Sequence, residues 1–554
     1  MRFRIQTRWF FAFLFSTTLF AGALTADENT GSIRLTADCA QAGPRIGNKA
    51  SNINLWKFQE LLNEKSDEGA DLRPFVEYIQ FMQATGSSPD RDLFVNPTDA
   101  AVLDDYRFEP LGDACAKALA LGAKPHIKMS VPSKYSPNGK LGDFSTNVYP
   151  PDDYAVYERY IAAMARFLVE RFGTDEVKTW RFGVLTEFEN PGWFKARSGS
   201  AEESREAYFK LYDFTVAALT QEIGPDVFVG AHAMACTEGL WDERDLLNHC
   251  ASGTNYATGK VGTPIHFFAC SYYDVRPGEP NQRGLISVVD AILQRAEEVG
   301  LSDLIYGIDE GRILFGVHAG TTADHLDARV VGRTYQAAFD ARLYKQMTDH
   351  DIDYFSAWSH SSGAAYCGYP TVGYYVAKNF AEFQNARSIP VETADSSLAE
   401  GVEVGAVVGV EPDALRVMVY NFKDDWDYAG AAKVTLELTA LPFAGQKVEV
   451  TETKIDDSVN FYVQWEKDRE KLGLGDKFGS WSPDDPSLDS PTTLSAPEVR
   501  KTYQNQLRKG YVEIANSLKP TFSSAAVPAD GKMIFTAELP RQGVVFYTVK
   551  SAEK

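Results

Sequence analysis

Two glutamates, Glu187 and Glu310, stand where a run of apolar, β-prone residues stops abruptly. Glu187 follows the run Trp180–Thr186 and precedes a turn at Asn190-Pro191, and Glu310 follows the run Leu304–Asp309. A buried parallel strand that ends in carboxylates is typical of an active-site face. Two carboxylates across one pocket suit glycosidic bond cleavage, in which one protonates the leaving oxygen and the other attacks the anomeric carbon or activates water.

The residues alone leave other roles for these glutamates open. The chain has 76 acidic residues, so a Glu at a strand end can equally be salt-bridged or solvated. Glu189 is a rival to Glu187, because strand alternation would keep both side chains on one face. We prefer Glu187, because the Asn190-Pro191 turn is expected to begin at Glu189 and to redirect it.

Short β-rich runs alternate with amphipathic helical stretches from residue 33 to about residue 390, which is the pattern of a parallel sheet wrapped by helices. Eight strands in a region of this size predict a (β/α)8 TIM barrel, in which catalytic groups sit at the C-terminal ends of the strands. Glu187 and Glu310 would then end the fourth and seventh strands and meet at one face. The expected strands are Ile33–Cys39, Tyr78–Met82, Lys124–Ser130, Thr179–Thr186, Val227–His232, His266–Ser271, Leu304–Asp309 and Tyr354–Ser359.

The helices between these strands carry clear end signals, and beyond Ser388 the pattern becomes β-prone throughout. We therefore expect a catalytic barrel over residues 27–390 and an antiparallel β-sandwich over residues 391–554. The segment Lys467–Ser495 is rich in Gly, Asp, Ser and Pro, which predicts a long loop. The expected helices are Asp153–Phe172, Ala207–Ile223 and Ser287–Val299, and the clearest sandwich strands are Ala414–Asn421, Lys433–Leu438 and Val544–Val549.

The N-terminus has the order of a secretory signal peptide, namely arginines up to Arg8, the apolar run Trp9–Phe20, and small residues up to Ala26. We expect residues 1–26 to be removed and the protein to be secreted or periplasmic. A membrane anchor is the alternative, but the apolar run is shorter than the roughly 20 residues that a span needs.

Composition and charge bound the remaining classes. With 554 residues, 44% of them hydrophobic, the chain can form large cores in two or three domains. A net charge of -21 without a basic block excludes a nucleic acid partner. No His, Cys or acidic cluster shows metal-ligand spacing, so no metal and no cofactor is expected. The six cysteines are sparse and scattered, which is more typical of buried thiols than of disulfides.

Several of these segments together resemble glycoside hydrolase family 39, which includes retaining β-xylosidases and α-L-iduronidases. The stretch Trp180–Glu187 is similar to the family motif Trp-x-Phe-Glu-x-Trp-Asn-Glu-Pro, whose last Glu is the acid/base. Ile308-Asp309-Glu310 stands at the nucleophile segment, usually Thr-Glu-Trp. The resemblance implies a barrel with a β-domain, with Glu187 as general acid/base and Glu310 as nucleophile. Further barrel segments that resemble the family are Tyr208–Tyr212, Val229-Gly230 and Phe355–Ser359, and the β-domain offers weaker matches at Val419–Phe422, Asp456–Asn460 and Leu539–Val544.

The chain departs from the family pattern at positions that would touch the sugar. Thr186 stands in place of the Asn that hydrogen-bonds the sugar 2-hydroxyl, so the usual recognition of that hydroxyl is in doubt. Ser271 replaces a His, whereas Tyr273 keeps the place of the Tyr that would hydrogen-bond the nucleophile. Trp358 is expected to stack on the sugar or else to pack in the core, and His232 is either a sugar contact or a structural residue.

Lys128 is the most suggestive departure, because relatives carry Glu there. By alternation His126 and Lys128 share a face. If that face is the pocket, Lys128 favours an anionic or sulfated sugar, and Arg312 could add to its charge. Lys128 can equally pair with a nearby carboxylate such as Glu187 or Glu310, or lie outside the pocket.

The sequence thus predicts a secreted retaining glycoside hydrolase that acts on an oligo- or polysaccharide. The alternative is an inactive carbohydrate-binding or scaffold protein that has kept the fold, as the changes at Thr186 and Ser271 would allow. The sequence indicates neither the sugar nor an oligomeric state. The residues expected to bind the sugar are His126, Lys128, Thr186, His232, Tyr273, Arg312 and Trp358.

Overall fold

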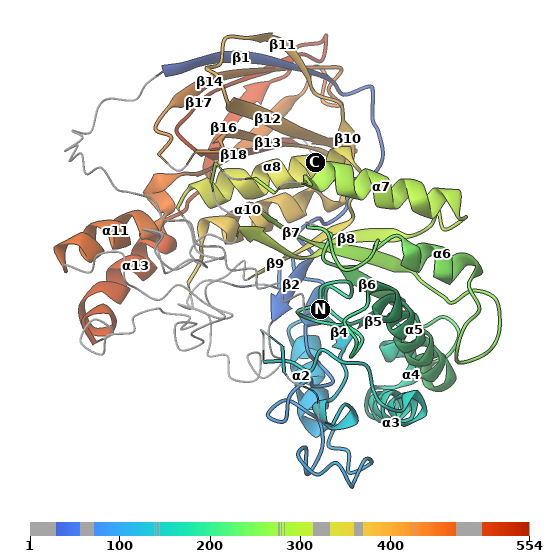
Figure 1. Ribbon diagram of the computed structural model, residues 1–554. Coiled ribbons are helices and arrows are strands. Elements are labelled where there is room, and N and C mark those ends of the chain that lie inside the picture. The colour runs from blue at the N-terminus through green and yellow to red at the C-terminus, as the bar shows by residue number, and fades with distance from the viewer. Residues whose placement is uncertain are drawn as a thin grey trace, which may run out of the picture.

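The structure, a computed structural model, has a parallel barrel with a β-sandwich packed beside it (Figure 1). It describes residues 29–55, 71, 73–137, 139, 141–142, 145–235, 237–274, 277–278, 280–281, 283–313, 333–358, 369–425, 427–472 and 501–552. Residues 1–26, which we expect to be a signal peptide, and the greater part of the loop expected at Lys467–Ser495 lie outside these residues.

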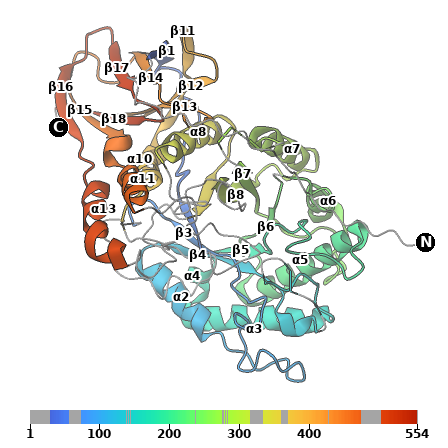
Figure 2. The same cartoon turned by 60° about the vertical axis from the view of Figure 1, so that its left-hand side comes forward.

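Eight parallel strands close the barrel in chain order, as the sequence predicted. Every strand pairs with its neighbour along the chain, and β2 pairs with β9 to complete the ring. In Figure 2 the helices of this half of the molecule lie outside the strands. The strands are β2 (Asn52–Leu55), β3 (Tyr78–Phe81), β4 (Lys124–Met129), β5 (Arg181–Val184), β6 (Val229–Ala233), β7 (Phe267–Asp274), β8 (Ile305–Ile313) and β9 (Tyr354–Trp358).

The first predicted barrel strand was wrong. Ile33–Cys39 does form a strand, β1 (Asn29–Asp38), but it pairs with two strands of the β-sandwich. The true first barrel strand, β2, was missed because it has only four residues and its two asparagines, Asn52 and Asn54, hide the apolar pattern. In the barrel, β2 thus takes the place that was predicted for β1. The strand before Glu187, β5, is still the fourth barrel strand, and the strand that contains Glu310, β8, is still the seventh.

The three helices predicted from their end signals are present, although α5 begins six residues before the predicted start at Ala207 and α7 begins two residues before Ser287. Asp153 caps α3 by accepting the N–H groups of Ala155 and Val156, and Ser200 caps α5 by accepting the N–H of Glu203. Each of these helices buries a set of apolar residues in the main core. The barrel helices are α2 (Glu109–Ala120), α3 (Tyr154–Phe172), α4 (Thr174–Val177), α5 (Ala201–Ile223), α6 (Asp245–Ser252), α7 (Leu285–Glu298), α8 (Tyr335–Asp349) and α10 (Val372–Phe380).

Two sheets face each other across a separate apolar core and form the β-sandwich. One has the order β11-β1-β14-β17 and the other β10-β12-β13-β18-β15-β16. The second sheet packs against α8, where Arg342 pairs with Glu403 at 2.8 Å. The strands are β10 (Arg387–Ile389), β11 (Glu392–Ser396), β12 (Val402–Val410), β13 (Ala414–Lys423), β14 (Ala431–Thr439), β15 (Lys447–Ile455), β16 (Thr521–Ala526), β17 (Met533–Leu539) and β18 (Val544–Ser551).

Two helices, α11 (Phe461–Lys471) and α13 (Arg508–Ala515), interrupt the sandwich between β15 and β16 and lie beside α10 (Figure 2). The start of the expected loop at Lys467 is therefore helical. None of the helices in the described part of the chain combines the length and apolar composition that a membrane crossing requires. Cys39, Cys115, Cys250 and Cys270 are free and buried, as expected, and the other two cysteines lie outside the described residues.

Candidate active site

The barrel brings Glu187 and Glu310 together at one end of its strands. One carboxylate oxygen of each, together with a ring nitrogen of His232, lies within 4.8 Å of the other two atoms. The exposed fractions are only 8% for Glu187 and 5% for Glu310, so both carboxylates lie in a largely enclosed site. The pairing that was predicted from the strand ends is therefore present in space.

Glu310 lies inside strand β8, at an irregularity of the ladder. Cys270 pairs with Ile308 and Ser271 with Glu310, so Asp309 is an extra residue on β8. Such a bulge lets consecutive side chains depart from strict alternation. Asp309 bonds to groups inside the barrel, and Glu310 accepts a 2.7 Å hydrogen bond from the hydroxyl of Tyr273. This is the contact that the family resemblance implied for Tyr273.

Glu187 lies in the loop after β5, where the backbone turns sharply. Its φ is 45°, and that of Leu185 is 62°, both in the left-handed region that side chains other than glycine avoid. The turn is closed by Asn190, whose N–H donates to the Glu187 carbonyl at 2.8 Å. The Asn190 side-chain amide donates to Oε2 of Glu187 at 2.7 Å, so the same residue also orients the carboxylate.

Lys128 lies on β4 inside the barrel and is completely buried. Its Nζ is 2.7 Å from Oδ2 of Asp309, which is also fully buried. Burial alone would raise the pKa of Asp309, but the ammonium outweighs it and holds that pKa below the usual range. The structure thus has the arrangement that was the alternative for Lys128, pairing with a carboxylate, although the partner is neither Glu187 nor Glu310.

The backbone opposite Lys128 leaves space for its side chain. Lys128 pairs with Gly183 on β5, and a Cβ at Gly183 would lie 3.3 Å from Cγ of Lys128 and 3.3 Å from Nε2 of His126. Gly183 stands where the family motif has Glu. Gly183 and Lys128, which both stand where the family resemblance leads us to expect Glu, are therefore neighbours, and the small residue leaves room for the large one.

His232 on β6 bonds to Lys128 of the ion pair and lies close to both glutamates. Its Nδ1 hydrogen-bonds with Lys128 Nζ, and its Nε2 lies 2.9 Å from Oγ of Ser271. Burial first, and the Lys128 charge second, lower the pKa of His232 well below its usual value. The imidazole is therefore neutral, with Nδ1 accepting from Lys128 and the Nε2 proton facing Ser271.

The remaining predicted residues are placed less directly at the site. Thr186 is 1% exposed, and its hydroxyl has no hydrogen-bond partner among the described groups. His126 lies deeper in the barrel, where its ring meets Phe267 edge-on and burial lowers its pKa to about 3. Arg312 pairs with Tyr273 and Trp358 with Asn54 through their backbones, and their side chains lie outside what the structure describes.

Two site residues were missed from the sequence. Asn190 was taken only as part of a turn, although an amide three residues after a catalytic Glu could have been noticed. Asp309 was taken as the end of a strand, and strand alternation would have directed it away from Glu310. The bulge that turns both side chains inward has no signal in the sequence.

The same geometry bears on metal binding. Glu187, His232 and Glu310 have the spacing of a three-ligand metal site. Both ring nitrogens of His232 are engaged, however, one by the Lys128 ammonium and one by Ser271. An ion would have to displace these bonds, so the arrangement fits paired catalytic carboxylates better than a metal centre.

Part of the chain resembles known sequences. Residues 93–384 match the model of Glycosyl hydrolases family 39. Over 148 residues the chain is 30% identical to a beta-xylosidase of Geobacillus stearothermophilus, and over 157 residues it is 29% identical to one of Caldicellulosiruptor saccharolyticus. Each match covers 28% of the relative's length and 26% or 28% of this chain, so these alignments concern only part of each protein.

Solved structures show the same fold over nearly the whole chain. A GH39 enzyme from Xanthomonas axonopodis pv. citri aligns with a TM-score of 0.64 over 95% of this chain and 98% of its own, at 16% identity. A bacterial orthologue of human α-L-iduronidase gives the same TM-score and identity, covering 94% of this chain and 84% of its own. Because residues 93–384, more than half of the chain, match the family model, the chain belongs to glycosyl hydrolases family 39.

Proposed function

We propose that the protein is a retaining glycoside hydrolase. The observation that carries the proposal is the short separation of Glu187 and Glu310: a carboxylate oxygen of one lies within 4.8 Å of a carboxylate oxygen of the other. Retaining enzymes hold their carboxyl groups about 5–5.5 Å apart, whereas inverting enzymes need about 6.5–9.5 Å to admit a water molecule. The spacing therefore favours direct attack by a carboxylate on the sugar.

The surroundings of the two glutamates support distinct roles. Glu310, bonded to Tyr273 on a rigid strand, attacks the anomeric carbon and forms a glycosyl-enzyme ester. Glu187 gives its proton to the departing oxygen, and then takes a proton from the water that hydrolyses the ester. Asn190 turns the Glu187 carboxyl group in the required direction.

We propose an uncharged sugar at this site, in place of the anionic or sulfated sugar first expected. The expectation depended on Lys128, whose ammonium is buried and paired with Asp309. Among the described side chains of this cluster, the carboxylates of Glu310 and Asp309 outnumber the Lys128 ammonium, because Glu187 carries the proton for the leaving group, and this disfavours a further anion. A xyloside, the substrate class in the names of both bacterial relatives, is the first substrate to test.

We also propose that the enzyme is exported, on the basis of the arginines, the apolar run and the small residues within residues 1–26. Expression of the full chain with and without residues 1–26 tests this. Activity in the medium or periplasm only with the segment present is the expected result. Activity that stays inside the cell in both cases would contradict export.

The hydrolase proposal is tested with a panel of aryl xylosides, rhamnosides and uronides. We expect cleavage by the wild type, loss with Glu187→Gln and Glu310→Gln, and a first-formed product with the anomeric configuration of the substrate in time-resolved NMR. Binding of sugars without cleavage of any member of the panel or of native glycans would favour the inactive carbohydrate-binding protein instead.

A further inference from the structure

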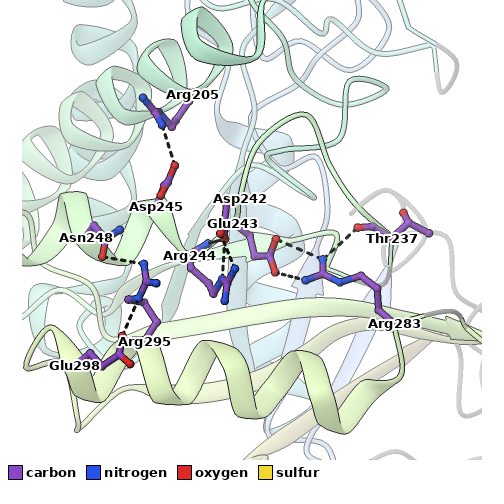
Figure 3. A network of polar contacts seen from close by, with 10 residues as sticks. All are labelled: Arg205, Thr237, Asp242, Glu243, Arg244, Asp245, Asn248, Arg283, Arg295 and Glu298. Atoms are coloured by element: carbon purple, nitrogen blue, oxygen red, sulfur yellow. Dashed lines mark hydrogen bonds and ion pairs between the residues drawn. The ribbon is translucent and has the colours of Figure 1, made fainter.

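The loop that leaves β6 is bonded from two sides. On one side, Oε1 of the fully buried Glu189 accepts the N–H groups of Met234 at 2.7 Å and Ala235 at 3.0 Å. On the other side, Arg283 donates to Oε1 of Glu243 at 2.9 Å and to the carbonyl of Thr237 at 3.5 Å. Figure 3 shows Arg283 reaching from the start of α7 toward both partners. The loop is thus a fixed support on which another segment can be aligned.

That other segment is the one that follows Glu187. The Phe188 N–H donates to the carbonyl of His232 at 3.1 Å, and the Leu240 N–H donates to the carbonyl of Glu189 at 2.8 Å. With the two bonds to its side chain, Glu189 and its neighbour make four hydrogen bonds to β6 and its loop. The chain directly after Glu187 is therefore aligned by β6 rather than by its own strand.

Such bonding is needed because the backbone here is strained. Glu187 has a φ of 45°, and Ala235, in the loop after β6, has a φ of 51°, so both residues have left-handed backbone conformations. A residue other than glycine keeps such a conformation only when its surroundings over-determine it. The carboxyl group of Glu189 holds Ala235 directly and holds Glu187 through the two intervening peptide bonds.

We propose that Glu189 is a positioning residue: its carboxyl group, bonded to the β6 loop, fixes the turn that aims the acid/base Glu187. This inference rests on the proposed function, because it assigns Glu189 a task in protonation of the leaving group. Glu189 itself does not touch the sugar, since its side chain is directed to Met234 and Ala235.

The charge state of Glu189 fits this task. Burial, and to a smaller extent the nearby Glu243 and Glu187, raise its pKa to about 8, against the opposing effect of the Ala235 hydrogen bond. The other ionisable groups that interact with it are Arg283, Tyr208 and Cys270. At neutral pH Glu189 is thus an uncharged acid whose carbonyl oxygen accepts both N–H groups, and it adds no negative charge beside Glu187.

Two variants test the proposal in the full-length enzyme. Glu189→Ala removes the acceptor, whereas Glu189→Gln keeps an uncharged carbonyl oxygen in its place. We expect Glu189→Ala to lower kcat/KM, which reports formation of the glycosyl-enzyme, roughly 10- to 100-fold on aryl glycosides with poor leaving groups, which need protonation. On dinitrophenyl glycosides, which leave without a proton, the loss of kcat/KM is small, and Glu189→Gln restores most of it in both cases.

The control is a buried carboxylate with similar bonds elsewhere. Asp213 on α5 is fully buried, accepts the N–H of Tyr256 at 2.8 Å and the hydroxyl of Thr263 at 2.6 Å, and bonds to Nε2 of His249 at 3.0 Å. Asp213→Ala should lower Tm without changing the ratio of kcat/KM between poor and good leaving groups. An equal change of that ratio in Asp213→Ala, an unchanged kcat/KM on poor leaving groups in Glu189→Ala, or a Glu189→Gln variant as impaired as Glu189→Ala would overturn the proposal.

Glu187→Gln, measured in the same assay, separates this inference from the proposed function. If Glu187→Gln keeps full activity, the function assigned to Glu187 fails. If Glu187→Gln loses activity on poor leaving groups while Glu189→Ala does not, only the positioning role fails.

The uncharged state has its own test, because a raised carboxyl pKa makes stability depend on pH. Between the usual value of 4.5 and about 8 the folded state binds a proton that the unfolded state releases. The stabilisation is complete below that window and is lost as the pH rises through it. We expect the Tm of the wild type to fall relative to that of Glu189→Gln across this range, and a constant difference would contradict the uncharged state.

Discussion

The two carboxylates of the site are held by different parts of the fold. Glu310 lies within a long strand and is held by side chains of the barrel interior, among them Tyr273 and the Lys128–Asp309 pair next to it. Glu187 lies in a turn and is held by the backbone and amide of Asn190 and by the segment fixed to the β6 loop. A nucleophile needs one fixed line of attack, whereas an acid/base must serve both the leaving oxygen and a water molecule, and the two supports match these needs.

The largest effect is expected on stability, from breaking the Lys128–Asp309 pair next to Glu310. Lys128→Met leaves the fully buried Asp309 charge without its partner, and breaking a buried pair costs about 3–5 kcal/mol. Denaturant unfolding should show this loss of stability, and the double variant Lys128→Met/Asp309→Asn should recover much of it. A single variant as stable as the wild type would show that the pair does not support the barrel.

A smaller effect is expected where Glu310 itself is held. Tyr273→Phe removes the hydroxyl that donates to Oε1 of Glu310, and a hydrogen bond to a charged group contributes about 1.5–3 kcal/mol. We expect kcat/KM to fall by roughly the corresponding 10- to 100-fold for good and poor leaving groups alike. Sensitivity confined to poor leaving groups would mean that Tyr273 serves the acid instead.

The smallest effect is expected on the Glu187 side. Asn190→Ala removes one amide donor from Oε2 of Glu187, while Glu189 and the β6 loop still hold the turn. A loss of about 1 kcal/mol, or roughly 5-fold in kcat/KM, should appear with poor leaving groups and be absent with dinitrophenyl glycosides. An equal loss on both substrates would remove the contrast between the two supports.

The sequence predicted those features of the site that depend on where the barrel strands end. The apolar runs before Glu187 and Glu310 placed both carboxylates at one face, whereas Tyr273 was singled out by the family resemblance. Alternation put Lys128 on one face with His126, but it did not tell whether that face points into the barrel, so the pairing with Asp309 stayed open. The β8 bulge, the left-handed turn at Glu187 and the short polar strand β2 depend on contacts between distant segments, which a local pattern does not contain.

The most direct test of the central claim is to trap the glycosyl-enzyme. An activated 2-deoxy-2-fluoro glycoside of a sugar that the wild type cleaves should label the protein once, and peptide mass spectrometry should place the sugar on Glu310. Glu187→Gln should still be labelled, because an activated leaving group needs no proton. A label on any other residue, or inactivation without a covalent adduct, would contradict the assignment of Glu310 as the nucleophile.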